Sequence, residues 1–600
     1  MNRMKCVALV PILVAAAGAS DADVRRHVEY LASPELAGRL TGTDGERRAA
    51  DYLVAELEAI GARPAPGASG LRMPFEFTSG SRDMGSWFEI EGKGGHRFNG
   101  DSRVQALSFS DDGDVSGPVV FAGYGLVVPD GQEIGYDSYI GLDVTDKIVL
   151  VLRYFPEDAD AQVRAALTPY SGLRYKALQA RERGAKALVV LTGPRSLNPG
   201  KTVPMTFDAA VAGSGIVATS IDGRVGAALF RRAGKSAEVV QRELDSGNPH
   251  VAGFEIPDVT IRVHVDVERE KRTGQNVVGY LAPRAADGSP VAPDGYVLVG
   301  AHYDHLGRGR HANSLAKRDE ENETHFGADD NASGVAAVLA AGADLATAGL
   351  RRGVLLAFWS GEELGQLGST AFVNNPPVDL GDIVAYVNLD MVGRMVDNRL
   401  NLQGVGSSPA WPKLVERTNV PIGFDAHTQD DPYLPTDSTV LYRAEVPTLN
   451  LFTGAHEDYH RPSDVPGKIA YDDLQRVARF AARLVVNLDG LDSRPEWVEV
   501  ERSPSRSGDR DTVRAYTGTI PDYATEVEGL RLSGVIGGGP ADKAGLVEGD
   551  VIVEFGGRKI ANVYDYTYAL DAVKIDETIR VVIVRDGKRL EVEITPTSRP

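Results

Sequence analysis

The chain contains 600 residues, which at about 150 residues per domain predicts three or four folded units rather than one core. Hydrophobic residues make up 42% of the chain and charged residues 25%, a composition that excludes disorder throughout. The formal net charge of −20 argues against nucleic acid as a partner, because an acidic protein repels the phosphate backbone.

The N-terminal segment is typical of a secretory signal peptide. Arg3 and Lys5 precede an apolar run of about 13 residues, shorter than the roughly 20 that a membrane-spanning helix needs. Residues 17–19 (Ala-Gly-Ala) match a small-residue cleavage site. We therefore expect cleavage after Ala19, no stable membrane span afterwards, and export to the periplasm or the exterior.

The single cysteine, Cys6, lies inside this predicted signal peptide. The mature chain would then contain neither a disulfide nor a thiolate ligand for a metal ion. Any metal ion must be bound by nitrogen and oxygen atoms.

The elements expected next in the chain belong to two different kinds of unit. Residues 21–62 are predicted to be helical, because apolar residues recur there at helical spacing. From about 115 to 255, short β-branched runs at 148–152 and 187–191 flank a predicted helix at 175–183. We expect a compact β-rich or α/β unit there, without a cluster of ionisable groups of its own.

From about 275 to 490, predicted strands alternate with helices. Strand-like apolar runs occur at 296–299, 354–358 and 383–387, and an alanine-rich helix is expected at 333–346. This alternation predicts an α/β fold with a mostly parallel sheet and helices on both faces.

The C-terminal part is predicted to be a separate small domain. A polar linker is expected at 491–514, followed by a β-rich domain at 515–597. Strands are predicted at 551–555 and 580–584, with a hairpin turn at 585–588.

Three of the predicted parallel strands lead directly into ionisable residues: His302, the pair Glu362-Glu363, and Asp390. In open α/β sheets, ligands bind at the carboxyl ends of the strands. Asp330 stands where a helix begins, and His460 stands in a loop rich in proline and glycine. We expect these side chains to converge on one site.

Such a set of side chains is suited to metal ions. Buried carboxylates side by side repel one another and cannot all stay ionised unless cations neutralise them. Mixed nitrogen and oxygen ligands suit zinc, with manganese or cobalt as substitutes. Five ligands are too many for one tetrahedral zinc with an open position, but they suit two metal ions bridged by one carboxylate.

Residues 456–460 also match the HExxH motif of another class of zinc peptidase. That motif requires a helix, so that both histidines share one face. Helix-breaking residues surround it here: Pro447, Gly454, Pro462 and Pro466. We therefore expect no HExxH zinc site, and we expect His456 to have a substrate-side or structural role.

Five motifs together resemble one known family. They are GAHYDH at 300–305, GADDNASG at 327–334, SGEELG at 360–365, NLDMVG at 388–393 and YHRPSD at 459–464. In this order they are similar to the co-catalytic zinc aminopeptidases related to secreted bacterial leucyl aminopeptidase and glutamate carboxypeptidase. The resemblance implies the zinc exopeptidase fold and two Zn²⁺ per chain. It implies that His302 and Asp390 bind one zinc, that Glu363 and His460 bind the other, and that Asp330 bridges both.

The resemblance also implies the chemistry. Glu362 would be the general base for a metal-bridged water, and Asp304 would orient the His302 ring. The expected activity is removal of N-terminal residues from peptides with a free N-terminus. Alternatives within the fold are a metallo-carboxypeptidase and a glutaminyl cyclase. A non-enzymatic scaffold would lack metal ligands, whereas all five positions are filled here.

The segments before and after the five motifs resemble two further kinds of domain. Residues 123–125 and 183–187 resemble a protease-associated domain, which would act as a lid that limits substrate size or merely as a stabilising insertion. Residues 538–552 resemble a PDZ domain with its carboxylate-binding loop near 516–520, and such a domain binds a C-terminal peptide as an added strand. The expected division is 1–19 signal peptide, 20–114 first part of the peptidase domain, 115–255 protease-associated domain, 256–490 second part of the peptidase domain with the metal site, 491–514 linker and 515–597 PDZ domain.

Overall fold

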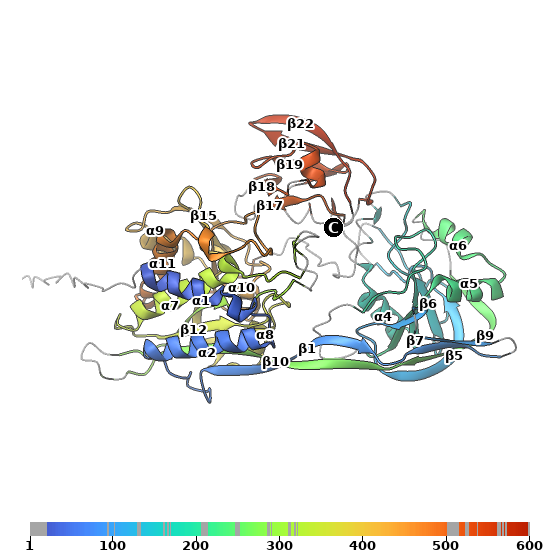
Figure 1. Cartoon of the computed structure of the whole chain (residues 1–600), viewed down its shortest axis with the longest axis horizontal. Helices are drawn as coiled ribbons and strands as arrows, with labels where there is room; N and C mark the ends of the chain where they lie inside the picture. Colours follow the sequence, from blue (N-terminus) through green and yellow to red (C-terminus); the bar gives the residue numbers. More distant parts are fainter. Residues whose placement is uncertain are drawn as a thin grey trace, which may run out of the picture.

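The computed structural model describes residues 21–597 apart from short segments, and within them two large sheets and one small C-terminal sheet (Figure 1). The segments left out are 93–94, 101, 129–133, 160–162, 165–166, 168–169, 206–213, 247–252, 285–288, 290, 310–313, 317–319, 321, 501–514, 522–526, 537, 561–565, 567–568 and 571–572. The predicted signal peptide and residues 501–514 of the predicted linker lie outside the described residues. In the described part, no helix is both long and apolar enough to cross a membrane.

The first sheet has eight strands in the order β1-β10-β12-β11-β13-β16-β14-β15. Its central strands β12, β11, β13 and β16 are parallel, whereas β10 joins β12 and β14 joins β16 in antiparallel fashion. The strands span Arg72–Asp83 (β1), Val267–Leu281 (β10), Gly353–Trp359 (β12), Tyr296–His302 (β11), Ile383–Leu389 (β13), Thr448–Phe452 (β16), Arg399–Gln403 (β14) and Asp425–Gln429 (β15). The three predicted parallel strands are therefore confirmed, each one to three residues longer at its carboxyl end than expected.

Helices cover both faces of this sheet, as predicted. Alternate strand residues face opposite sides, so that Val297 and Val299 pack in one core and Leu298 in the other. The helices of the larger core are α1 (Asp21–Leu31), α2 (Asp44–Ala59), α7 (Gly334–Leu345), α9 (Trp411–Asn419) and α11 (Tyr471–Asp489). The smaller core contains α8 (Leu367–Asn374) and α10 (Asp437–Arg443).

The long strands β1 and β10 form an antiparallel ribbon that leads into the second unit (Figure 1). The sheet of that unit has the order β3-β2-β9-β5-β6-β7-β8-β4. Its strands are Trp87–Ile90 (β2), His96–Asn99 (β3), Val104–Ala106 (β4), Gly113–Phe121 (β5), Ile148–Leu152 (β6), Ala187–Leu191 (β7), Val217–Ile221 (β8) and Phe254–Val265 (β9), and its helices are Leu173–Glu182 (α4), Gly223–Arg232 (α5) and Ala237–Leu244 (α6). The sheet thus includes β2, β3 and β4, which precede the expected start at residue 115.

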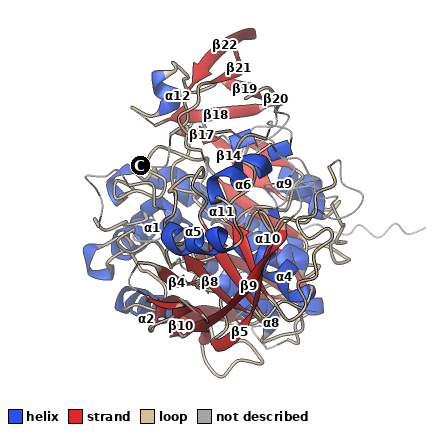
Figure 2. Ribbon diagram, turned by 90° about the vertical axis from the view of Figure 1, so that its right-hand side faces the viewer, coloured by secondary structure: helices blue, strands red, loops and turns tan. Residues whose placement is uncertain are grey.

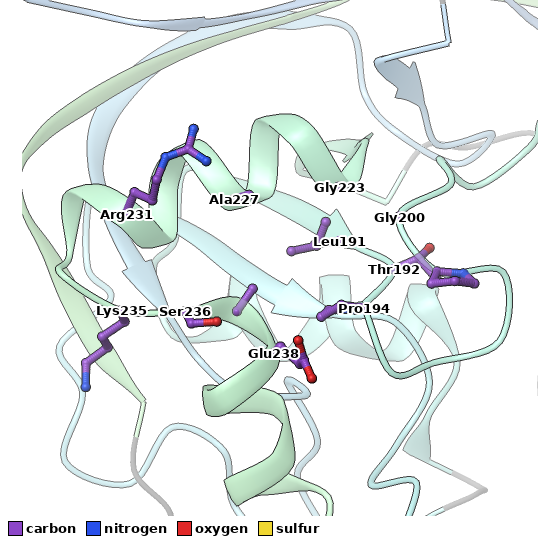
Figure 3. A pocket seen from close by; sticks show the side chains of 12 residues that line it. Leu191, Thr192, Pro194, Gly200, Gly223, Ala227, Arg231, Lys235, Ser236 and Glu238 are labelled. Atoms are coloured by element: carbon purple, nitrogen blue, oxygen red, sulfur yellow. The ribbon is translucent and has the colours of Figure 1, made fainter.

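The second unit contains a cavity of about 440 Å³ (Figure 3). Leu191 and Ala227 are among the apolar residues that line it, and Arg231, Lys235 and Glu238 bring exposed charges to its edge. The cavity lies beside α5 and α6, far from the strands of the first sheet (Figure 1). It is therefore separate from the ionisable residues singled out in the sequence.

The C-terminal sheet stands on one side of the molecule, at the top of the view in Figure 2. Its strands are Thr519–Pro521 (β17), Leu530–Val535 (β18), Val551–Phe555 (β19), Arg558–Lys559 (β20), Ile579–Arg585 (β21) and Lys588–Ile594 (β22), with a short helix Pro540–Lys543 (α12). The predicted hairpin turn is present, because Arg585 pairs with Lys588. Lys574 Nζ lies 3.6 Å from Asp158 Oδ1 of the second unit, an exposed ion pair of the kind that contributes about 0–1 kcal/mol.

The first part of the expected linker, residues 491–500, packs against the unit that contains the first sheet, here called the first unit. The backbone N–H of Val498 donates to Ser407 O at 2.9 Å, and that of Val500 donates to the hydroxyl of Tyr442 at 2.6 Å. The ring of Trp497 lies 5.5 Å from the ring of Tyr442. The first unit therefore extends to Val500.

A buried arginine, Arg39, joins the segments that later form the site. Its guanidinium donates to the carbonyl oxygens of Tyr303 (2.7 Å), Phe326 (2.8 Å) and Gly327 (3.0 Å), and also to that of Leu31. Burial lowers the pKa of Arg39 to about 10, so the group remains cationic at neutral pH. One side chain thus connects the end of α1 with two loops that lie more than 260 residues away.

We expect Arg39→Met to lower the free energy of unfolding by roughly 3–5 kcal/mol, because it leaves several buried carbonyl groups without a donor. Urea denaturation followed by the fluorescence of the buried Trp359 and Trp411 measures this loss. The control is Arg47→Met, since Arg47 is exposed and pairs with the exposed residues Asp44 and Asp51. A loss at Arg39 no larger than that of the control would contradict the role given to Arg39.

Candidate metal centre

Three adjacent strands carry four of the sequence-predicted residues to one edge of the first sheet. His302 is the last residue of β11 and pairs with Trp359, so Glu362 and Glu363 follow directly after the neighbouring strand β12. On the other side of β11, Gly300 pairs with Asn388 of β13, which brings Asp390 level with His302. The parallel register alone therefore gathers these side chains.

Asp330 reaches the same edge from a tight loop before α7. The carboxylate of Asp464 accepts hydrogen bonds from the backbone N–H groups of Asp329 (2.9 Å) and Asp330 (3.1 Å). Gly327 has φ +57°, and a Cβ there would lie 2.1 Å from Asp330 O and 2.5 Å from the His305 ring. Only glycine fits at this position without moving the loop.

His460 approaches from a loop of turns, not from a helix. Residues 456–460 contain no helical segment, so the structure agrees with the expectation that the HExxH pattern is coincidental. His456 Nε2 lies 3.1 Å from Asp329 Oδ2. His456 therefore contacts the loop that carries Asp330.

The five sequence-predicted ligands converge around Asp330. His302 Nε2 lies 3.2 Å from Asp330 Oδ1 and 3.4 Å from Asp390 Oδ1. His460 Nε2 lies 3.2 Å from the other oxygen, Asp330 Oδ2, and 3.1 Å from Glu363 Oε2. All five side chains are buried. The cluster thus consists of two groups that share one carboxylate.

These spacings fit metal ions. Four ligand atoms arranged tetrahedrally at about 2.0–2.1 Å from a zinc ion lie about 3.3 Å from one another. The separations of 3.1–3.4 Å in both groups match this value. Donor sets able to hold an ion occur on both sides of Asp330, as His302, Asp330 and Asp390 and as His305, Asp330 and Glu363.

Glu362 lies beside the cluster with its own supports. Gln366 Nε2 donates to Glu362 Oε1 at 3.1 Å, and the backbone N–H of Glu362 donates to Asp304 Oδ1 at 3.2 Å. Asp304 Oδ2 also accepts a hydrogen bond from Thr41 Oγ1 at 3.0 Å. The nearest acceptor of His302 Nδ1 is the backbone oxygen of Asp304, at 3.3 Å, whereas the Asp304 carboxylate is 3.7 Å away.

Burial and neighbouring charges shift the pKa values of the two adjacent glutamates in opposite directions. Burial alone would raise the pKa of Glu363, but His460 and His305 hold it down to about 2. Burial raises the pKa of Glu362 well above its usual range, with neighbouring carboxylates adding to the effect. One glutamate therefore stays ionised, while the other has an increased affinity for a proton.

Several contributing residues were not assigned from the sequence. His305 Nδ1 lies 2.7 Å from Glu363 Oε1, and the buried carboxylate of Asp437 accepts a hydrogen bond from Ser369 Oγ. Burial raises the pKa of Asp437 to about 7. His305 stands inside one of the five motifs and could have been noticed there, whereas no local pattern points to Arg39.

Comparison with known proteins identifies two families that match parts of the chain. The model of peptidase family M28 matches residues 276–496, and that of the PDZ domain matches residues 512–595. An aminopeptidase of Pseudomonas aeruginosa is 35% identical over 144 residues, which cover 24% of this chain and 23% of that protein. Leucine aminopeptidase 2 of Trichophyton rubrum is 24% identical over 271 residues, 40% of this chain and 50% of that protein.

Among solved structures, a zinc aminopeptidase from Bacillus subtilis aligns with 78% of this chain and 94% of its own, at 21% identity and a TM-score of 0.43. The chain spans half or less of the length of the two curated relatives. The family match covers the whole cluster from His302 to His460. Residues 276–496 are therefore similar to peptidase family M28, and residues 512–595 are similar to the PDZ domain.

Proposed function

We propose that the chain is an exported aminopeptidase that uses two zinc ions to remove N-terminal residues from peptides. The observation that carries the proposal is the position of Asp330, whose two carboxylate oxygens each lie 3.2 Å from a different imidazole. His302 and Asp390 would hold one ion, Glu363 and His460 the other, and Asp330 both. When bound, the ions would lower the pKa of a water molecule and polarise the scissile carbonyl group.

In the proposed reaction, Glu362 carries the proton. Its raised pKa favours acceptance of a proton from the attacking water, which it then passes to the leaving amine nitrogen. Gln366 and Asp304 hold the side chain and the backbone of Glu362, respectively, so the carboxylate is oriented before the substrate arrives.

The charge of the site favours a free N-terminus over a C-terminal carboxylate. The clustered carboxylates attract an α-ammonium group. A carboxypeptidase requires a cation for the carboxylate of its substrate, but Arg394 lies 3.1 Å from Asp458 Oδ2 and is neutralised there. Of the other arginines near the motifs, Arg308 is exposed and Arg461, which follows His460, is half-buried. The clustered carboxylates support aminopeptidase over carboxypeptidase action.

Two further functions belong to the flanking units. The second unit is joined to the peptidase unit through the β1/β10 ribbon, and we assign it the role of a lid that limits substrate size. The PDZ domain would bind C-terminal peptides along the edge strand β17 and tether long substrates, which raises their effective concentration. Export is part of the proposal because of the positively charged and apolar residues near the N-terminus.

A panel of aminoacyl chromogenic substrates, with metal content measured on the same sample, tests the function. We expect turnover of substrates with a free amino group, two zinc ions per chain, loss of activity on chelation and recovery with zinc or cobalt. N-acetylated versions of the same substrates are the control and should not be cleaved. One metal ion per chain with cyclisation of N-terminal glutamine, or cleavage from the carboxyl end, would contradict the proposal.

Glu362→Gln should retain both metal ions and the fold, yet lose about 10²–10⁴-fold in kcat, because the amide cannot accept the proton. The matched control is Glu58→Gln, an exposed glutamate on α2 whose replacement should leave kcat unchanged. Steady-state kinetics with metal analysis compares them. Near-normal turnover by Glu362→Gln would remove this residue from the mechanism.

Removal of residues 501–600 should leave a folded peptidase with unchanged kcat/KM on small substrates, because the cluster and the docked segment end before residue 501. On a long peptide, the truncated enzyme should have a higher KM than the full chain. Kinetics of both forms on one long peptide measures the difference. Equal KM values, with no binding of C-terminal peptides to the full chain, would show that the domain does not act as a tether.

A further inference from the structure

His305 is a buried imidazole beside the cluster. It is not one of the five predicted metal ligands. Its Nδ1 atom lies 2.7 Å from Glu363 Oε1, and both side chains are almost completely buried. The other oxygen, Glu363 Oε2, lies 3.1 Å from His460 Nε2. The two oxygens of one carboxylate are thus divided between two imidazoles.

The ring of His305 is fixed on several sides. A Cβ at Gly327 would lie 2.5–2.6 Å from its ring carbons, so the backbone of the Asp330 loop packs directly against the ring. The backbone N–H of His305 donates to Arg39 O at 3.3 Å. Its Nε2 atom is buried without a hydrogen-bond partner among the described residues. Within the part of the chain that the structure describes, the single polar contact of the ring is therefore the carboxylate of Glu363.

That contact determines which ring nitrogen carries the proton. A neutral imidazole has one N–H and one lone pair, and an ionised carboxylate only accepts hydrogen bonds. Nδ1 therefore carries the proton of the ring wherever Glu363 is ionised, and it donates to Oε1 at 2.7 Å.

We propose that His305 is a positioning residue, which holds Glu363 Oε1 and leaves only Oε2 to bind the second metal ion. This inference rests on the proposed two-metal function. Hydrogen bonds to metal-binding carboxylates fix their orientation, and their loss typically costs about 10–100-fold in metal affinity. His305 thus selects monodentate binding by Glu363 and sets the affinity of the position shared with His460.

The test compares three variants of the full chain, after metal removal, by titration with Zn²⁺ against a chelating indicator. His305→Leu removes the donor and should weaken one of two zinc sites by about 10–100-fold. His305→Asn keeps an N–H near the position of Nδ1 and should retain an affinity near that of the wild type. His325→Leu is the matched control, because His325 is equally buried next to His305 but contacts Ser314 and a backbone oxygen.

A second readout separates positioning from a general structural effect. At saturating zinc, His305→Leu should recover most of its kcat, because Glu362 and all five ligands remain. The absorption spectrum of the cobalt-loaded protein should change for His305→Leu and not for His325→Leu.

Unchanged zinc affinity in His305→Leu would overturn the inference. Equal losses in His305→Leu and His305→Asn would also overturn it, because they would indicate that His305 binds the metal ion directly. A wild-type chain without two zinc sites would overturn the proposed function as well, and the same titration identifies that case.

Discussion

The carboxylate of Asp330 lies between two imidazoles, and several contacts within the first unit hold it there. Its oxygens face His302 on one side and His460 on the other. The loop that carries it is bound by Asp464 through two backbone N–H groups and requires glycine at position 327. A shift of this carboxylate would disturb both groups of ligands at once, because Asp330 belongs to both.

Electrostatics explains why so many supports surround this point. Several carboxylates are buried together, and such groups repel one another unless cations lie among them. The chain supplies one cation itself, Arg39, whose guanidinium connects the surrounding loops through backbone oxygens and not through a carboxylate. The carboxylates therefore remain available for metal ions, while the buried charge of Arg39 still reduces their repulsion.

The parts that the sequence predicted well depend on local patterns. The apolar runs before His302 and before Glu362 predict where two strands end. Parallel pairing of these strands then brings the two residues to the same edge of the sheet. Contacts between distant segments could not be predicted in this way. Arg39 has no local signal, since its partners at 303 and 326–327 become neighbours only in the fold. The same reason applies to β2 and β4, which pair with strands far along the chain and so extend the second unit before residue 115.

The claim that Asp330 bridges two metal ions is tested most directly by a crystal structure of the zinc-loaded chain with anomalous scattering recorded at the zinc edge. We predict two peaks about 3.5–4 Å apart, the separation typical of two-metal sites, with one Asp330 oxygen directed at each. His302 and Asp390 should surround one peak, and Glu363 and His460 the other. A single peak, or two peaks that do not share Asp330, would contradict the account.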